Sequence, residues 1–183
     1  MSIRLAQKGD IPAILTIYGH YVEKTAYSFE YIAPDEREFT ERFERITKQF
    51  PFFVYEEEGQ VVGYAYADLP FERAAYRWCA ESSVYLHPDA RGRGIGKALY
   101  AALEETLTAQ GYAVLYAVIT TSNEDSIAFH KAVGYSHLAD FPQCGFKHGR
   151  WEGITWMEKR LKSVELTTNE PISFPLLVKT YQK

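Results

Sequence analysis

The sequence has little of what marks secreted, membrane-spanning or strongly charged proteins. It contains only two cysteines, Cys79 and Cys144, whose spacing fits neither a disulfide framework nor a metal site. No apolar run reaches the roughly 18 residues that a membrane-spanning helix needs. The first residues, "MSIRLAQKGDIP", contain no apolar h-region, so we expect no secretory leader. The net charge of −4 favours neither nucleic acid nor a membrane surface. We therefore expect a cytoplasmic protein with reduced thiols and no metal, nucleic acid or membrane partner.

The bulk composition is that of an ordinary globular domain. Apolar residues make up 46% of the chain, charged residues 24% and aromatic residues 15%. A length of 183 residues suits one domain with a substantial core. We expect that domain to cover residues 1–162. Residues 163–183 carry two prolines and are expected to be a C-terminal extension that packs on the body or on a neighbour.

The hydrophobic periodicity predicts alternating strands and helices. Strands are expected at residues 3–7, in a hairpin that turns at Glu58–Gly59, and at residues 76–88, 113–120 and 149–161. Helices are expected after an N-cap at Asp10, over residues 35–49, from the glycine-rich segment to Gly111, and from Ser122 or Asn123 to Gly134. The order β-α-α-β-β-β-α-β-α-β predicts an α/β (α+β) fold with a mixed sheet.

The segment "RGRGIGK", Arg91 to Lys97, places three glycines where a helix should begin. Glycine is a poor helix former, so the segment must need bare backbone. Unpaired N–H groups and the positive end of the helix dipole attract anions there, and Arg91, Arg93 and Lys97 add positive charge. The segment therefore predicts a phosphate site, and the alternative is a surface turn with solvated charges.

Two well-known phosphate motifs do not match this segment. A P-loop would require glycine at Arg91 and Ser or Thr at Ala98. A dinucleotide fingerprint matches Gly92 and Gly94 but fails at Lys97. The pattern that matches is Q/R-x-x-G-x-G/A, which is formed here by Arg91, Gly94 and Gly96.

With this loop the sequence resembles the GNAT superfamily of acetyl-CoA-dependent N-acetyltransferases. The loop follows the strand end "VYLHP" and precedes an amphipathic helix, an apolar strand and the elements Asn123, Ser126 and Gly134–Tyr135. The resemblance covers Ile3 to Leu161. It implies a mixed, mostly antiparallel central sheet flanked by helices, with acetyl-CoA as co-substrate.

Four segments resemble a narrower branch, the phosphinothricin and methionine sulfoximine acetyltransferases. They are "YSFEYIAPD", "YRWCAESSVYLHP", "FHKAVGY" and "GFKHGRW". Enzymes of that branch acetylate the α-amino group of small amino-acid analogues. The resemblance implies such an acceptor and a homodimer. Direct transfer in a ternary complex is expected separately, because Cys79 has no obvious base partner nearby.

Glu81 is the candidate general base. It lies in the middle of a predicted strand among small and apolar residues, where Glu is disfavoured. A carboxylate there takes a proton from the amine, directly or through water. The alternative is an exposed carboxylate on the outer face of the sheet, and the resemblance favours the base. Cys79 is expected to be a packed side chain rather than a nucleophile.

The resemblance also assigns the cofactor site. In GNAT enzymes the strand before the loop pairs with the pantetheine arm, and one of its N–H groups donates to the thioester oxygen. The residues implied are Val84, Tyr85 and Leu86 through their backbone, the loop residues Arg91, Gly92, Arg93, Gly94, Ile95, Gly96 and Lys97, and the polar residues Asn123 and Ser126. Asn123 has the alternative role of a helix cap.

His130 occupies the helical position where many GNAT enzymes carry a tyrosine that protonates the departing thiolate. Histidine can donate a proton near neutral pH. The alternative is a histidine that only forms hydrogen bonds with the cofactor or a neighbour.

The acceptor is expected opposite the thioester, and the resemblance supplies the candidates. Arg73 can hold a carboxylate with two hydrogen bonds, which suits a free amino acid. The full set of candidate acceptor residues is Phe29, Arg73, Tyr76, Lys147 and His148.

Two other functions remain open from the sequence. One is acetylation of a different amine, such as a protein N-terminus, a ribosomal protein or a polyamine. The other is a coenzyme A-binding module without turnover, in which Glu81 would be dispensable.

Overall fold

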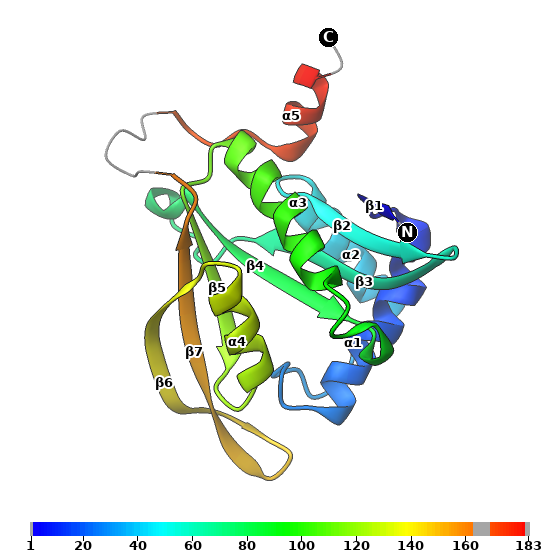
Figure 1. The fold of residues 1–183 in the computed structure, drawn as a ribbon, viewed down its shortest axis with the longest axis vertical. Helices are drawn as coiled ribbons and strands as arrows, with labels where there is room; N and C mark the ends of the chain where they lie inside the picture. Colours follow the sequence, from blue (N-terminus) through cyan, green and yellow to red (C-terminus); the bar gives the residue numbers. More distant parts are fainter. Residues whose placement is uncertain (1, 163–168, 182–183) are drawn as a thin grey trace.

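The computed structural model describes residues 2–162 and 169–181. Within them, seven strands form one sheet in the order β1-β2-β3-β4-β5-β7-β6 (Figure 1). All neighbouring strands are antiparallel except β4 and β5, so the expected mixed, mostly antiparallel sheet is confirmed. The strands are β1 (Ser2–Leu5), β2 (Phe52–Glu57), β3 (Gln60–Asp68), β4 (Cys79–Leu86), β5 (Val114–Thr120), β6 (Ser136–Lys147) and β7 (Arg150–Arg160). The helices are α1 (Ile11–Lys24), α2 (Glu36–Thr47), α3 (Ile95–Gln110), α4 (Glu124–Ala132) and α5 (Phe174–Tyr181).

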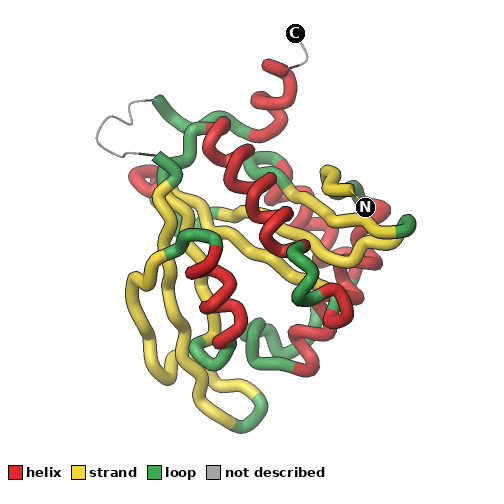
Figure 2. The backbone as a smooth tube through the Cα atoms, viewed as in Figure 1, coloured by secondary structure: helices red, strands yellow, loops and turns green. Residues whose placement is uncertain are grey.

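The alternation along β3 determines which helix packs on which face of the sheet. Gly63 lies under α3, where an added Cβ would come 3.5 Å from the Leu99 side chain. Tyr64 points to the opposite face, where its ring stacks on Tyr85 and joins the aromatic residues that pack against α1 and α2. As a result α3 and α4 cover one face and α1 and α2 the other (Figure 2).

The helix that follows the glycine-rich segment is anchored by four residues at four-residue spacing. Ile95, Leu99, Leu103 and Leu107 are all at most 3% exposed. Each such side chain contributes roughly 1.5–3 kcal/mol through burial. The helix ends at Gly111, whose φ of 104° is the left-handed conformation that favours glycine. The predicted start, face and end of α3 are therefore confirmed.

Two predicted details differ in the structure. Asp10 occupies the N-cap position of α1 as expected, but its carboxylate forms no capping hydrogen bond, because it accepts hydrogen bonds from the Gln7 backbone and from Arg4 instead. The strand predicted from residue 76 begins only at Cys79, because Ala74–Tyr76 form a 3-10 turn.

The sequence analysis also missed an entire strand, β6, and the helix α5. β6 is the edge strand of the sheet, and most of its side chains are exposed, so it lacks the one-sided alternation that marks a strand. Its pairing with β7 is interrupted at His137/Ala139 and again at Phe141/Gly145. Within this second interruption lie Pro142 and Gln143, the latter with a φ of 53°.

The described part of the C-terminal extension packs at the C-terminal end of α3 (Figure 1). The backbone N–H of Ile172 donates to Gln110 O, and that of Phe174 donates to Gln49 O, both at 2.9 Å. The boundary at residue 162 stays a prediction. None of the helices in the described ranges is long and apolar enough to cross a membrane.

Candidate active site

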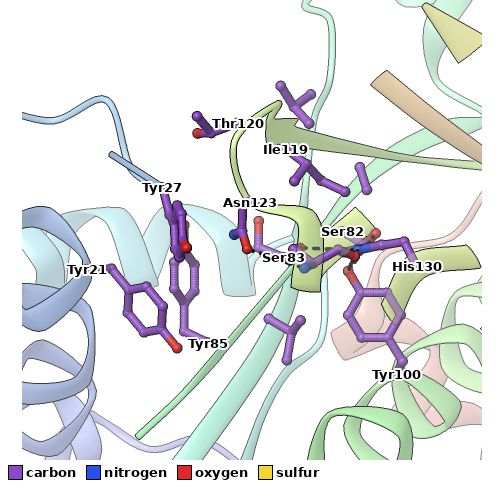
Figure 3. Close-up of a pocket in the computed structure, with 14 residues that line it drawn as sticks. Tyr21, Tyr27, Ser82, Ser83, Tyr85, Tyr100, Ile119, Thr120, Asn123 and His130 are labelled. Carbon is purple, nitrogen blue, oxygen red and sulfur yellow. Dashed lines mark hydrogen bonds between the residues drawn. The ribbon is translucent and has the colours of Figure 1, made fainter. Parts of the chain in front are cut away.

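The site lies where β4 and β5 part. Their parallel pairing covers only Cys79 to Glu81 and ends at Glu81 opposite Tyr116. Beyond this point a cleft opens between the strands, bordered by α1, α3 and α4 (Figure 3). Two adjoining pockets form it, one near His130 and one at the start of α3. Both are lined by Tyr21, Tyr27, Val84, Asn123 and Ser126.

One backbone edge of β4 is unpaired along this cleft. The His87 N–H donates to Val62 O of the β3 side, which sets the alternation of hydrogen bonds along the strand. The backbone groups of Tyr85 therefore face β3, whereas those of Val84 and Leu86 face the cleft. Leu86 O accepts from the Tyr21 hydroxyl at 2.7 Å. An extended ligand thus meets the backbone of Val84 and the side chain, rather than the backbone, of Tyr85.

The start of α3 offers six adjacent backbone donors. Among the residues that the structure describes, none of the N–H groups of residues 92–97 donates a hydrogen bond. Gly92 and Gly94 have φ values of 71° and 79°, and both have open space where a Cβ would stand. Free amides at the positive end of a helix dipole form a site for a phosphate or diphosphate. The geometry therefore fits the diphosphate of a coenzyme.

The three cationic side chains of this segment differ in direction. Arg91 and Lys97 line the cleft, and the Arg91 guanidinium lies 5.3 Å from the centre of the Tyr21 ring. Arg93 instead forms an ion pair with Glu57 at 2.6 Å. The predicted positive charge at the cleft is therefore supplied by two side chains, and Arg93 offers it a backbone N–H.

α4 closes the opposite side of the cleft. The Asn123 side chain accepts from the Ser126 N–H at 3.2 Å, so it caps α4 while lining both pockets. The cap and the cleft contact that the sequence left as alternatives are therefore compatible. Ring atoms of Phe129 lie 3.3 Å from the position of a Cβ at Gly96, which holds α4 close to the start of α3.

Glu81 stands at the point where the strands part. Among the described residues, its carboxylate has no hydrogen-bond or ion-pair partner. Burial and, to a smaller extent, the nearby charge of Asp68 raise the pKa of Glu81 from 4.5 to about 7. Asp68 itself is held by Arg45 through two hydrogen bonds of 2.6 and 2.7 Å. A half-buried, unpaired carboxylate with such a pKa is suited to proton transfer near neutral pH.

His130 is 3% exposed, and both of its ring nitrogens are engaged. Nδ1 lies 2.7 Å from Ser126 O, and since a carbonyl only accepts, Nδ1 carries the proton. Nε2 then accepts from the Tyr100 hydroxyl at 2.8 Å. Burial lowers the pKa of His130, which favours the neutral ring. In this state His130 has no nitrogen free for a departing thiolate.

The sequence analysis missed the partners of His130. The Tyr100 hydroxyl also lies 3.3 Å from Ser82 Oγ (Figure 3). Ser82 Oγ in turn contacts the Tyr135 hydroxyl at 2.9 Å. Tyr100 falls on the buried stripe of α3 beside Leu99, so in the sequence it looks like another core residue. Only the spatial approach of α3, α4 and β4 reveals the polar cluster.

The acceptor candidates Arg73 and Tyr76 lie in the loop between β3 and β4, beside the sheet face that carries Glu81. In this loop Phe71 packs on Tyr76 with ring centres 4.6 Å apart and contacts the edge of Tyr116, the strand partner of Glu81, at 6.1 Å. The Arg73 side chain is exposed and makes no hydrogen bond or ion pair within the described ranges. Its guanidinium is therefore available to a carboxylate.

The remaining candidates lie between the α1–α2 loop and the β6–β7 hairpin. The Phe29 ring fills the space over Gly145, where an added Cβ would come 2.2 Å from it. Lys147 is 2% exposed and donates to Val22 O and Ser28 O at 2.8 and 2.5 Å. Lys147 thus fixes the loop that carries Phe29, whereas His148 is exposed at the tip of the hairpin.

The comparisons with known proteins agree with this geometry. Residues 3–156 match the acetyltransferase (GNAT) domain family. The chain is 38% identical over 164 residues to an L-methionine sulfoximine/L-methionine sulfone acetyltransferase of Pseudomonas aeruginosa, covering 87% of this chain and 94% of that one. A phosphinothricin acetyltransferase of Sinorhizobium meliloti, solved in complex with AcCoA, aligns with a TM-score of 0.86, 40% identity and coverage of 93% and 92%.

A third relative carries a different name. The structure named ribosomal-protein-alanine N-acetyltransferase from Brucella melitensis aligns with a TM-score of 0.85 and 37% identity, covering 87% of this chain and 99% of that one. The matched residues include Glu81 and the residues that line the cleft. The chain belongs to the GNAT family of acetyltransferases.

Proposed function

We propose that this acetyltransferase transfers the acetyl group of acetyl-CoA to the α-amino group of a small amino acid or analogue, in a ternary complex. The observation that carries the proposal is the cleft, which runs from six free amides at the start of α3 to the point where β4 and β5 part, just after Glu81. A diphosphate held at one end and a thioester at the other match these two features.

In the proposed reaction, the Glu81 carboxylate takes a proton from the ammonium form of the acceptor. The free amine attacks the thioester carbonyl carbon, the N–C bond forms and the C–S bond breaks. The N–H of Val84 faces the cleft and donates to the carbonyl oxygen as negative charge develops there. The attacking nitrogen then loses its second proton to water, the departing thiolate takes up one proton, and Glu81 returns its proton to solvent, so that one proton is released overall.

His130 as the source of the thiolate proton stays a prediction. Its Nδ1–H donates to Ser126 O, so release of that proton requires this hydrogen bond to break. The remaining cofactor assignments follow the lining of the cleft. They are the backbone of Val84 and Leu86, the ring of Tyr85, the amides of residues 92–97, the charges of Arg91 and Lys97, and the polar groups of Asn123 and Ser126.

The acceptor class rests on Arg73 and on the relatives. Two relatives are named for methionine sulfoximine or phosphinothricin, which are small amino-acid analogues with a carboxylate. Arg73 would hold that carboxylate, and Phe29 and Tyr76 would enclose the side chain. Lys147 and His148 would act through the loop that they contact.

The Brucella melitensis relative favours a second candidate, a protein N-terminus that begins with alanine. Coenzyme A release should be measured with phosphinothricin, methionine sulfoximine, methionine sulfone, ordinary amino acids, a polyamine and peptides with N-terminal alanine. We expect the highest kcat/KM with a free amino-acid analogue. Turnover of peptides alone would select the second candidate, and binding of acetyl-CoA without any turnover would reduce the protein to a coenzyme A-binding module.

The proposal includes a cytoplasmic location and a homodimer. Both cysteines are free, which suits a reducing compartment. The hairpin of β6 and β7 exposes large apolar side chains at the edge of the sheet, as expected of a surface that pairs with a second copy. These are Leu138, Phe141, Phe146 and Trp151. Light scattering of the purified protein tests this assembly, and a monomer at micromolar concentration would exclude it.

A further inference from the structure

The described part of the C-terminal extension contacts the loop that borders the proposed acceptor side. The Trp78 Nε1–H donates to Asn169 O at 2.9 Å, and Arg77 forms an ion pair with Glu170. Among the residues that the structure describes, these are the only hydrogen bonds or ion pairs that side chains of residues 70–78 make outside the loop. The extension is therefore the partner of all the polar side-chain contacts that leave this loop, whose backbone is also held where Trp78 O accepts from the N–H groups of Ala113 and Val114.

The extension itself is firmly attached to the body. The Gln110 side chain, 2% exposed, donates to Ile172 O at 2.8 Å, and Ile172 N–H returns a hydrogen bond to Gln110 O at 2.9 Å. Pro171 lies over Gly111, with its Cα 3.4 Å from the position of an added Cβ. These contacts hold residues 171 and 172 at the C-terminal end of α3, and so fix the position of the preceding residues 169 and 170.

Arg77 connects Glu170 of the extension to the turn that carries Tyr76. Its Nε donates to Ala74 O at 2.9 Å, within the Ala74–Tyr76 turn, while its guanidinium pairs with Glu170. Arg73 precedes the same turn, and its carbonyl accepts from the Tyr76 N–H. A shift of Arg77 therefore moves both acceptor candidates.

We propose that residues 169–170 brace this loop and that Arg77, Trp78 and Glu170 are positioning residues for the acceptor. The inference rests on the proposed function, because the loop matters to catalysis only if the acceptor binds beside it. Residues 169 and 170 lie outside residues 3–156, which match the family model. The proposal assigns a role in acceptor affinity to a segment that follows the residues matched by the family model.

The test uses three variants of the full-length protein. Glu170→Lys places two cations together, Trp78→Phe removes the N–H but keeps an aromatic ring, and the double variant Arg77→Glu/Glu170→Lys restores an ion pair of opposite direction. Glu44→Lys is the matched control, because it reverses the charge of another exposed ion pair, with Lys8, on the far end of the fold. For each variant we would measure kcat, the KM of both substrates, the thermal midpoint and amide hydrogen exchange.

We expect Glu170→Lys and Trp78→Phe to raise the acceptor KM about three- to tenfold while the acetyl-CoA KM stays within about twofold. The double variant should recover most of the loss, and Glu44→Lys should change neither KM. An unchanged acceptor KM in both single variants would overturn the proposal. An equal rise of both KM values with a lower thermal midpoint would also overturn it, since that pattern means general destabilisation.

Hydrogen exchange separates this inference from the proposed function. The amides of Tyr76 and Arg77 are hydrogen-bonded within the loop, so their exchange reports its order. We expect Glu170→Lys to accelerate exchange at these two amides and not along α3. If the wild-type protein acetylates no acceptor, the proposed function fails, and unchanged exchange at Tyr76 and Arg77 would then refute the brace as well.

Discussion

Glu81 and Tyr116 form the last register pair between β4 and β5 before the two strands diverge. Glu81 thereby stands at the end of the only parallel strand pairing in the described sheet, one residue before the cleft lining begins at Ser82. A parallel pair that stops after three residues leaves one strand edge free, and the carboxylate at its end has no partner of its own. The position of this carboxylate and its lack of a partner lead to two predictions for Glu81, one for the reaction rate and one for stability.

The rate of acetyl transfer should rise with pH through about 7, because the carboxylate of Glu81 must be ionised to accept the amine proton. Glu81→Gln should lower the acceptor kcat/KM at pH 7.5 by about 10²-fold or more and remove this rise. The acetyl-CoA dissociation constant should stay the same, since the amide has nearly the shape of the carboxylate. Steady-state rates across pH and calorimetry provide both measurements, and full activity of the variant would exclude Glu81 as the base.

Glu81→Gln should also stabilise the fold, and only at neutral to alkaline pH. The folded state raises the pKa of Glu81 from 4.5 to about 7, so the unfolded state ionises first as pH rises through this window. The wild-type protein thus loses stability between these values, by at most about 3 kcal/mol. Urea unfolding should show little difference between the two proteins at pH 4.5 and a more stable variant at pH 8. A difference that is the same at both values would contradict this explanation.

A Cβ at the start of α3 should weaken acetyl-CoA binding. Gly94→Ala places a methyl group beside the free amides, and we expect the acetyl-CoA KM to rise about tenfold or more. Gly59→Ala is the matched control, because Gly59 has nearly the same φ of 78° and open space, in a hairpin turn that does not line the cleft. Both changes should cost roughly 1–2 kcal/mol of stability through backbone strain. Equal KM values in the two variants would show that the segment does not hold the cofactor.

His130→Phe should reduce kcat less than Glu81→Gln does. The change removes the hydrogen-bond acceptor of the buried Tyr100 hydroxyl, so we expect a loss of roughly 1–3 kcal/mol of stability. The rise in rate near pH 7 should persist, because Glu81 causes it. Tyr100→Phe tests the same hydrogen bond from its other end and should have a similar cost. A changed acid or alkaline limb in the pH–rate profile of His130→Phe would assign the histidine a direct proton transfer.

Lys147→Met should act through the α1–α2 loop. It leaves the buried carbonyl oxygens of Val22 and Ser28 without their shared donor, at a cost of roughly 1–3 kcal/mol. The loop that carries Phe29 should become less ordered, so the acceptor KM should rise while the acetyl-CoA KM stays constant. Lys131→Met, at an exposed position on α4, is the control. An acceptor KM equal to that of the control would separate Lys147 from the acceptor side.

The parts of the fold with strong local signals were predictable from the sequence. The stripe of Ile95, Leu99, Leu103 and Leu107 and the stop at Gly111 determine α3, and the turn at Glu58–Gly59 determines the hairpin of β2 and β3. β6 was not predictable, because an edge strand with exposed side chains and two pairing interruptions carries no alternation. Tertiary contacts also decide details such as Asp10, whose carboxylate binds Arg4 instead of capping α1.

The candidate site was predictable where a motif determines it. The glycine-rich segment and the position of Glu81 were accessible from residue pattern and resemblance. The direction of a side chain was not, since Arg93 turns to Glu57 and Lys147 turns to two carbonyls that are over a hundred residues away in the chain. The polar cluster around Tyr100 was hidden for the same reason, because its members come from three elements.

Because β4 and β5 are already separated, the binding site for an extended ligand exists before the ligand arrives. A ligand that lies along Val84 gains main-chain hydrogen bonds without displacing a neighbouring strand, because β5 has already turned away. The protein therefore breaks no hydrogen bonds between β4 and β5 when the ligand binds. Encounter should then be governed by diffusion and by the attraction of Arg91 and Lys97 for an anionic tail, and not by a slow rearrangement of the sheet.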